Sequence, residues 1–345
     1  MSISPANTAA SAAAALVRPI GQIEIANEVP PLPPLDHPLD IHFHAPEAAE
    51  EENEITLRGY TVASESPSGT ESQPEVVKDM LVVAPGDEVI YTLYWQSEQA
   101  VPDGIQVFNQ LLDHNRQTLT QINQPLQLSQ GAPYYLWNPY WRRENHYRLA
   151  IPEDAVGGIY QPYVGIYQLD SGERFLATEA NGTSIGDAVF LPPIKVARRT
   201  AMPLANPVSA RFGDVIRLEG YEIALPSEGL HAQSTLTLTL QYKSLSPTPI
   251  DYTQFIHLFD AELGMAAQID TPPQGNGNPT STWIPGEVIV DVIPLQISEA
   301  AQAGRYTLSI GLYDPVSGGA RLPLFSQDDQ PLPDNQLILG EVEIQ

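Results

Sequence analysis

Apolar and polar residues alternate with a period of two in several short segments of the chain. Residues 235–242 read Thr-Leu-Thr-Leu-Thr-Leu-Gln-Tyr, and residues 306–312 alternate in the same way. A period of two is that of a β-strand with one buried face. The residues expected on these two faces are Leu236, Leu238, Leu240, Tyr242, Tyr306, Leu308, Ile310 and Leu312. We therefore predict one strand at each segment.

Two further segments extend the prediction to a fold class. Residues 255–259 are apolar on both faces, as expected of a central strand that is covered on both sides. Pro162 interrupts an alternating segment and lacks a ladder N–H, so we expect that strand at a sheet edge or at a bulge. The 33 prolines and 24 glycines separate short strands, and a convincing amphipathic helix pattern is missing. The sequence predicts an all-β fold of antiparallel, immunoglobulin-like β-sandwiches.

The strand pattern occurs twice in the chain, because residues 55–196 and 209–344 are two copies of one module. The shared landmarks include Leu57-Arg-Gly-Tyr60 with Leu218-Glu-Gly-Tyr221, Phe108 with Phe255, and Trp137-x-Pro139 with Trp283-x-Pro285. A repeat of this length is a duplicated domain rather than a solenoid unit, whose period is about 50 residues or less. Residues present in both copies are expected to serve the fold, and residues present in one copy are candidates for function.

The repeat divides the chain into three regions. Residues 1–37 are rich in Ala and Pro and are expected to form an extended tail or linker. Residues 38–198 are predicted to form the first β-sandwich, and residues 203–345 the second. The first copy also carries two inserts, residues 47–52 and 64–79, whose acidic and polar composition predicts solvated loops.

Charge and composition restrict the kinds of partner and chemistry. The chain has 42 acidic and 16 basic residues, for a formal net charge of −26, and such a surface repels nucleic acid. The absence of cysteine excludes disulfides, thiolate metal sites and a cysteine nucleophile. No segment approaches the roughly 18 apolar residues of a transmembrane helix. Residues 1–17 lack the basic region and the apolar core of a secretory signal. We therefore expect neither a transmembrane helix nor a secretory signal.

A set of motifs recurs across the module. The second copy contains Leu218-Glu-Gly-Tyr221, Phe255-Ile-His-Leu-Phe-Asp260, Gln268-Ile-Asp-Thr-Pro-Pro273, Pro279-Thr-Ser-Thr-Trp-Ile-Pro-Gly-Glu287 and Gly311-Leu-Tyr-Asp314. The first copy keeps Pro85-Gly-Asp87 and Leu93-Tyr-Trp95 but departs at Gln110, Asn123 and Tyr140-Trp141. These motifs resemble the C-terminal, non-membrane domain of mannosyltransferase-like bacterial membrane glycosyltransferases of the Chloroflexota type. The resemblance implies a location at a membrane or cell surface. It implies no transferase activity, because the catalytic acidic residues of that family belong to its membrane part.

His257 and Asp270 flank a predicted hairpin, so their side chains could meet across it. Such a pair is either an acid–base pair or half of a metal site, or a polar tie between two strands. The aligned residues of the first copy are Gln110 and Asn123. These amides have similar shapes and keep a hydrogen bond, but they cannot perform acid–base chemistry. We therefore predict a structural polar tie in both copies.

The aromatic residues fall into a shared and an unshared group. The shared pairs, expected in the core, are Tyr60/Tyr221, Trp95/Tyr242, Trp137/Trp283, Tyr160/Tyr306 and Tyr167/Tyr313. The first copy alone has a cluster around Trp137 made of Tyr134, Tyr135, Tyr140, Trp141, Arg142 and Arg143. Tyr, Trp and Arg dominate interface hot spots, and aromatic rings also stack on sugars. We expect this cluster to contact a partner or a glycan. The alternatives are a contact between the two domains and a loop that caps the sandwich.

Motifs of catalysis and of cofactor binding are missing from the sequence. It has no nucleophile elbow, P-loop, dinucleotide-binding glycine pattern or metalloprotease helix, and no EF-hand spacing. We expect no cofactor, no metal site and no enzymatic activity. The leading hypothesis is a non-catalytic interaction or assembly protein, extracytoplasmic or at the cell surface, whose partner is a protein or a cell-surface glycan, including a membrane protein complex. The alternatives are a carbohydrate-binding module that serves a membrane glycosyltransferase, a glycan-active enzyme, and a cytoplasmic location.

Overall fold

The computed structural model describes residues 35–45, 54–67, 75–97, 104–126 and 142–345. Residues 34–345 belong to one compact unit. The predicted tail, residues 1–37, and the acidic insert, residues 47–52, lie wholly or almost wholly outside the described residues. The first described strand begins at His37, close to the predicted start of the first module.

The first copy folds into two sheets. One sheet has the strand order β11-β10-β1-β2-β5-β8, made of β1 (His37–His44), β2 (Ile55–Glu65), β5 (Glu88–Gln96), β8 (Arg142–Ala150), β10 (Leu176–Glu179) and β11 (Ser184–Gly186). The other has the order β3-β4-β13-β9-β6-β7, with β12 also paired to β9. Its strands are β3 (Val76–Val77), β4 (Met80–Val83), β6 (Ile105–Leu112), β7 (Thr118–Pro125), β9 (Gly158–Gln168), β12 (Val189–Phe190) and β13 (Ile194–Val196). The described pairs are antiparallel except for β4 and β13, which run parallel.

The second copy repeats this arrangement. One sheet has the order β19-β16-β15-β14-β22, made of β14 (Asn206–Phe212), β15 (Ile216–Ala224), β16 (Thr235–Ser244), β19 (Val288–Gln296) and β22 (Leu324–Phe325). The other has the order β18-β17-β20-β21, with β23 also paired to β20. Its strands are β17 (Thr253–Asp260), β18 (Gly264–Thr271), β20 (Gly304–Asp314), β21 (Ala320–Arg321) and β23 (Leu337–Ile344). Three short 3₁₀ helices, η3 (Pro273–Asn276), η4 (Thr280–Thr282) and η5 (Pro333–Asn335), lie between strands.

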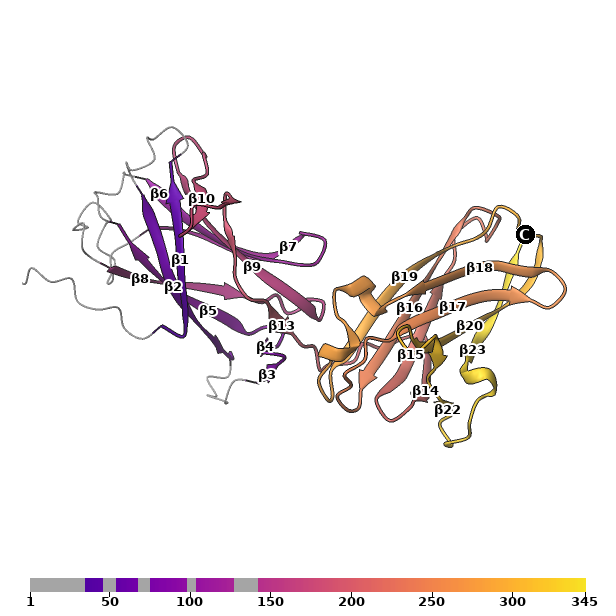
Figure 1. Ribbon diagram of the computed structural model, residues 1–345. Coiled ribbons are helices and arrows are strands. Elements are labelled where there is room, and N and C mark those ends of the chain that lie inside the picture. The colour runs from indigo at the N-terminus through magenta and orange to yellow at the C-terminus, as the bar shows by residue number, and fades with distance from the viewer. Residues whose placement is uncertain (1–34, 46–53, 68–74, 98–103, 127–141) are drawn as a thin grey trace, which may run out of the picture. The chain divides into compact units, whose positions relative to one another are not determined.

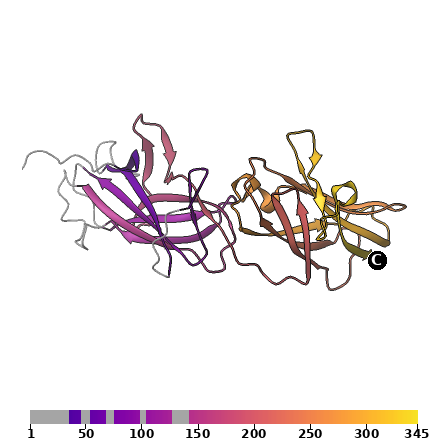
Figure 2. The ribbon, with the colours of Figure 1, turned by 90° about the horizontal axis from the view of Figure 1, so that it is seen from below.

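The prediction of an all-β fold with two antiparallel sandwiches is confirmed. Figure 1 shows the two layers of strands in each copy, and Figure 2 shows the same layers after a quarter turn. Each copy has its own apolar core between its sheets. The predicted inward faces are buried, with Leu236, Leu238, Leu240 and Tyr242 in the second core and their counterparts Val89, Tyr91, Leu93 and Trp95 in the first. Each buried Leu of this kind contributes roughly 1.5–3 kcal/mol to the free energy of unfolding.

The glycine shared by Gly-x-Tyr in both copies supports an aromatic ring. A Cβ added to Gly165 would lie 2.5 Å from the Phe108 ring, and one added to Gly311 would lie 2.2 Å from the Phe255 ring. Only glycine lets the ring lie flat on its strand. A guanidinium covers each ring from outside, Arg174 at 4.4 Å from the Phe108 centroid and Arg321 at 4.2 Å from that of Phe255.

The expectation that Pro162 marks an edge or a bulge is wrong for the strand itself. β9 lies inside its sheet, between β6 on one side and β12 and β13 on the other. The Pro162 carbonyl accepts the Leu191 N–H at 3.0 Å, so the nitrogen of Pro162 faces the same neighbour. That neighbour is interrupted between Phe190 and Ile194, and the interruption lies where a ladder N–H is missing.

A buried ion pair joins the last strand of the first copy to the second copy. Lys195 of β13 and Glu287, which precedes β19, are both fully buried, and their Nζ and Oε1 atoms are 2.8 Å apart. Lys195 also donates to Asn278, and the Ile284 N–H donates to the other oxygen of Glu287 at 3.0 Å. Burial lowers the pKa of Lys195, and the carboxylate of Glu287 opposes that shift. A charge removed from water in this way needs its partner.

Contacts around this pair close the junction. Val82 and Ala197 of the first copy pack with Ile284 in a small apolar cluster. The Val288 N–H donates to the Arg198 carbonyl at 2.7 Å, and Lys78 Nζ donates to Ser281 Oγ at 2.6 Å. The Trp-x-Pro-Gly-Glu motif of the second copy thus supplies a carboxylate to the preceding domain.

Replacing Lys195→Ala should lower the free energy of unfolding by about 3–5 kcal/mol, because it leaves a buried carboxylate without its partner. The double variant Lys195→Met, Glu287→Gln should lose much less, since glutamine still accepts the Ile284 N–H. Denaturant unfolding measures both. Arg305→Ala is the control, because its pair with Glu341 is exposed and is worth at most about 1 kcal/mol. Equal losses in the single and double variants would contradict this reading.

Candidate functional site

Most of the predicted contact cluster falls outside the described residues. The residues of the cluster that fall outside are Tyr134, Tyr135, Tyr140 and Trp141. The backbones of Arg142 and Arg143 begin the edge strand β8, opposite Gln96 and Trp95 of β5. The contact role of this cluster stays a prediction.

The predicted polar tie between His257 and Asp270 stays a prediction, whereas that between Gln110 and Asn123 needs correction. The hairpin of β17 and β18 forms as predicted, but His257 lies opposite Gln268, and Asp270 lies opposite Phe255. The two are therefore diagonal neighbours, too far apart for the direct pairing of opposite residues. In the first copy Gln110 donates to Gln121, directly opposite, at 2.8 Å, while Asn123 lies opposite Phe108. In the first copy the tie between the strands is therefore made by Gln121 rather than by Asn123.

His257 lies beside a guanidinium. Burial lowers its pKa, the Asp270 carboxylate opposes that shift, and Arg321 reinforces it. The imidazole is therefore neutral at pH 7 and packs 5.0 Å from the Phe255 ring, centroid to centroid. This is the environment of a packing residue rather than of an activated base.

The shared aromatics are mainly core residues, as predicted. Tyr60, Trp95, Tyr242, Trp283 and the pair Tyr160/Tyr306 are buried. Tyr160 and Tyr306 each donate a hydrogen bond to the carbonyl four residues earlier, on Val156 and Gln302, at 2.8 and 3.0 Å. Tyr167 and Tyr313 are only half-buried, and Trp137 lies outside the described residues.

One buried polar network belongs to the second copy only. Gln254 donates to the Asp291 carboxylate at 2.5 Å and accepts from the Tyr242 hydroxyl at 2.8 Å. Burial raises the pKa of Asp291, against the hydrogen bond from Gln254. The aligned residues of the first copy are Asn145, Val107 and Trp95. The network is closed on itself inside the core, which favours a structural role.

A row of aromatic rings lies on the outer face of the β6–β9 sheet of the first copy, and two of its members, Tyr163 and Phe190, have no aromatic counterpart in the second copy. Phe190 of β12 is 38% exposed, and its ring centroid is 4.6 Å from that of Tyr163. The Tyr163 ring is 5.8 Å from Phe108, which in turn lies 6.4 Å from Tyr167. The rings form a row across strands β9, β6 and β12.

Charged groups border this row. The Arg116 guanidinium lies 4.3 Å from the Phe190 centroid. Asp187 accepts from Tyr163 Oη at 2.5 Å and pairs with Arg174 at 2.8 Å. Burial tends to raise the pKa of Asp187, but the hydrogen bonds from Tyr163 and Arg174 outweigh it and hold the pKa below its ordinary value. Burial and the bond to Asp187 raise the pKa of Tyr163 to about 12. We call Tyr163, Phe190, Arg116, Arg174 and Asp187 the aromatic–arginine face.

The sequence differences between the two copies could have identified this face. Tyr163, Phe190 and Arg116 correspond to Ser309, Ile338 and Leu263 of the second copy, because Phe190 pairs with Tyr163 as Ile338 pairs with Ser309. The sequence prediction used the same reasoning but stopped at the denser cluster around Trp137. Residues 116, 163 and 190 are far apart in the chain, and only the sheet brings them together.

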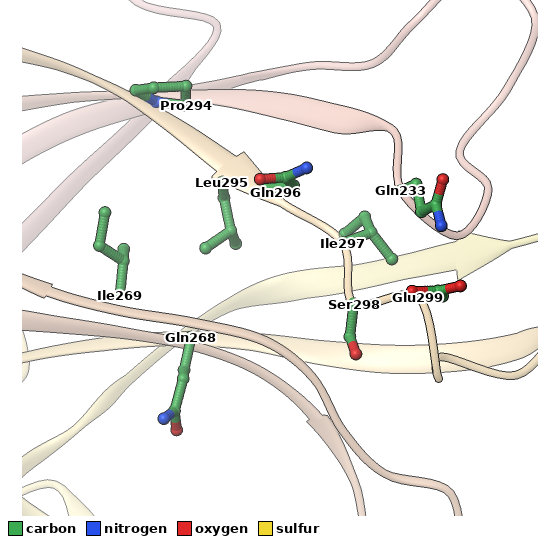
Figure 3. A pocket seen from close by; sticks show the side chains of 9 residues that line it. All are labelled: Gln233, Gln268, Ile269, Pro294, Leu295, Gln296, Ile297, Ser298 and Glu299. Carbon is green, nitrogen blue, oxygen red and sulfur yellow. The ribbon is translucent and has the colours of Figure 1, made fainter.

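Two hollows in the second copy lack paired carboxylates. One, of about 580 Å³, lies between the edges of β18 and β19, and Glu299 is the only acidic residue that lines it (Figure 3). The other, of about 480 Å³, lies beside His257 and Arg321, and its only acidic residue is Asp334. Neither matches the paired carboxylates that glycoside hydrolysis requires.

The described part of the chain carries neither a cluster of metal ligands nor a membrane-spanning helix. Within the described ranges, no three His, Asp or Glu side chains gather in a way that could hold a metal ion. His42 and His44 do gain a shared neighbour, Glu54, whose oxygens lie 2.5 and 3.9 Å from their ring nitrogens. None of the helices in the described part of the chain is long and apolar enough to cross a membrane.

Comparisons with known proteins do not assign a family. No protein-family model matches the chain, and no curated protein matches it. Among solved structures, the C-terminal domain of the antigen I/II polypeptide BspA from Streptococcus agalactiae aligns at 7% identity and a TM-score of 0.20, over 83% of this chain and 99% of that domain. The C-terminal domain of AspA from Streptococcus pyogenes aligns at 8% identity and a TM-score of 0.22, over 83% and 98%. Scores this low do not identify a shared function.

Phe190→Ala should change the free energy of unfolding by less than about 1 kcal/mol, because the ring is exposed. Phe108→Ala, which empties a buried position in the same row, should lose about 3–5 kcal/mol. Denaturant unfolding of the two variants measures the difference. A loss at Phe190 as large as that at Phe108 would mean that Phe190 belongs to the core.

Proposed function

We propose that this protein is a non-catalytic interaction or assembly module, extracytoplasmic or at the cell surface, that binds a protein partner through the aromatic–arginine face. The observation that carries the proposal is the exposed Phe190, stacked with Tyr163 and covered by Arg116, in the first copy only. The second copy has the same sheet without these three residues.

The composition of the face supports a binding role. Aromatic residues and arginine are enriched where a few side chains supply most of the binding energy. Phe190 has apolar surface to bury, and the Arg174–Asp187 pair and Arg116 provide a polar border. The arginines also stand out against the net charge of −26, so they offer a local positive contact to an acidic partner.

The sequence resemblance supports the location. It relates the module to the non-membrane domain of bacterial membrane glycosyltransferases, which suggests a membrane protein complex as the partner. The chain would then act as an accessory domain of such a complex and would not itself transfer sugar.

A carbohydrate ligand is the second candidate, favoured by one feature of the same face. The Tyr163 hydroxyl, the Asp187 carboxylate and the Arg174 guanidinium form one hydrogen-bonded group beside exposed aromatic rings. Polar groups of this kind beside stacking rings can bind sugar hydroxyls. The face would then serve as a carbohydrate-binding module for the associated enzyme.

The double variant Tyr163→Ser, Phe190→Gln, which replaces both aromatic rings of the face with polar side chains, tests the proposal. Its capture by native membranes should fall at least about tenfold relative to the wild type, since two hot-spot side chains are lost. Ile338→Gln is the matched control, because it replaces an exposed apolar residue of the second copy and should bind normally.

Undiminished capture of the double variant would contradict the proposed contact face. A parallel glycan array separates the two candidates. Glycan binding that the double variant loses would favour the carbohydrate-binding module, and turnover of a glycan would overturn the non-catalytic reading.

A further inference from the structure

A hollow of about 500 Å³ lies within the compact unit, where the first copy meets the second. The first copy contributes the turn between β6 and β7 and the segment that leads into β9. The second contributes the outward face of β19 and the loop at residues 274–277. A volume of this size falls within the range of small-molecule sites, about 300–1,000 Å³.

Direct contacts fix two walls of this hollow. The Ile159 N–H of the first copy donates to the Gly277 carbonyl of the second at 2.8 Å. The His114 ring packs against Gly277 so closely that an added Cβ would lie 2.5 Å from its Nδ1 atom. Together with the buried Lys195–Glu287 pair, these contacts fix the two copies on either side of the hollow.

Three exposed apolar side chains line the hollow. Val156 is 56% exposed, Met202 is 41% exposed, and Val292 is 60% exposed. They come from three separate segments and face the same space. Apolar side chains gathered in a concave site gain free energy when a ligand covers them, about 25 cal/mol for each Å² removed from water.

The charged groups of the hollow are mainly acidic. The carboxylates of Asp113 and Asp154 line it, against the guanidinium of Arg198 and the ring of His114, while the Asp291 carboxylate is bound to Gln254 inside the core. The Asp113 carboxylate accepts the backbone N–H groups of Asn115 and Gln117 at 2.8 and 2.7 Å, which fixes its position in the turn. Arg198 donates through Nε to the Thr200 carbonyl.

The negative field reaches the base of the hollow. Burial, and after it the Asp113 carboxylate, raise the pKa of Tyr160 to about 12. A net charge of −26 adds a long-range attraction for cations. The combination of an apolar lining and an acidic border selects against anions.

We propose that this hollow binds a small organic cation with an apolar body, such as an aromatic or aliphatic amine. The apolar part of the ligand covers Val156, Met202 and Val292, and its ammonium group lies toward Asp113 and Asp154. The site is separate from the aromatic–arginine face, and its existence does not depend on the function proposed for that face.

Phenethylammonium, phenethyl alcohol and phenylacetate are three probes of one shape and different charge. When phenethylammonium is titrated into the full chain and followed by NMR, it should bind with a dissociation constant of no more than about 10 mM. The alcohol should bind at least about fivefold more weakly, and phenylacetate should show no saturable binding, because only the amine matches the acidic border.

Val292→Lys should weaken phenethylammonium binding at least about tenfold, since it places a like charge over the apolar lining. Val316→Lys is the matched control, because Val316 is 92% exposed and lies outside the hollow, and it should bind as the wild type does. Asp154→Asn should weaken the amine and leave the alcohol unchanged. Absence of amine binding, equal binding of phenylacetate, or normal binding by Val292→Lys would overturn the proposal.

Discussion

The ion pair between Lys195 and Glu287 is the constraint on which the arrangement of the two copies depends. Both side chains are fully buried, so neither can exchange its partner for water without a large loss of stability. Lys195 belongs to the strand that completes the first sandwich, and Glu287 ends the Trp-x-Pro-Gly-Glu motif of the second. The motif that looks like a mark of the module is therefore also the point where one module holds the preceding one.

The duplication explains which residues serve the fold. In both copies a phenylalanine lies on a bare glycine under a guanidinium, and a buried tyrosine donates to the carbonyl four residues earlier. These shared groups fix neighbouring strands of one sheet and the turn that leads into β9 or β20. The residues that differ between the copies lie in two kinds of position. In the second copy Tyr242, Gln254 and Asp291 form a closed polar network in the core, and in the first copy Tyr163, Phe190 and Arg116 lie outside, on the sheet surface.

The sequence was informative where the physics is local. Period-two alternation predicted the strands and their buried faces, because each face is decided by neighbouring residues. It was wrong at Pro162, where the partner strand is interrupted instead, and in pairing Gln110 with Asn123, because the register of the hairpin places Gln121 opposite Gln110. The Lys195–Glu287 pair and the aromatic–arginine face were missed. Their members are distant in the chain, and only sheet topology brings them together.

The central claim is that residues peculiar to the first copy carry the external contact. Hydroxyl-radical footprinting of the chain, free and bound to native membranes, tests this claim most directly because it reports each side chain in place. The account predicts protection of Tyr163 and Phe190 on binding, with Tyr313 and Ile338 of the second copy unchanged. Unchanged labelling of Tyr163 and Phe190 in the bound chain, or protection confined to the second copy, would contradict it.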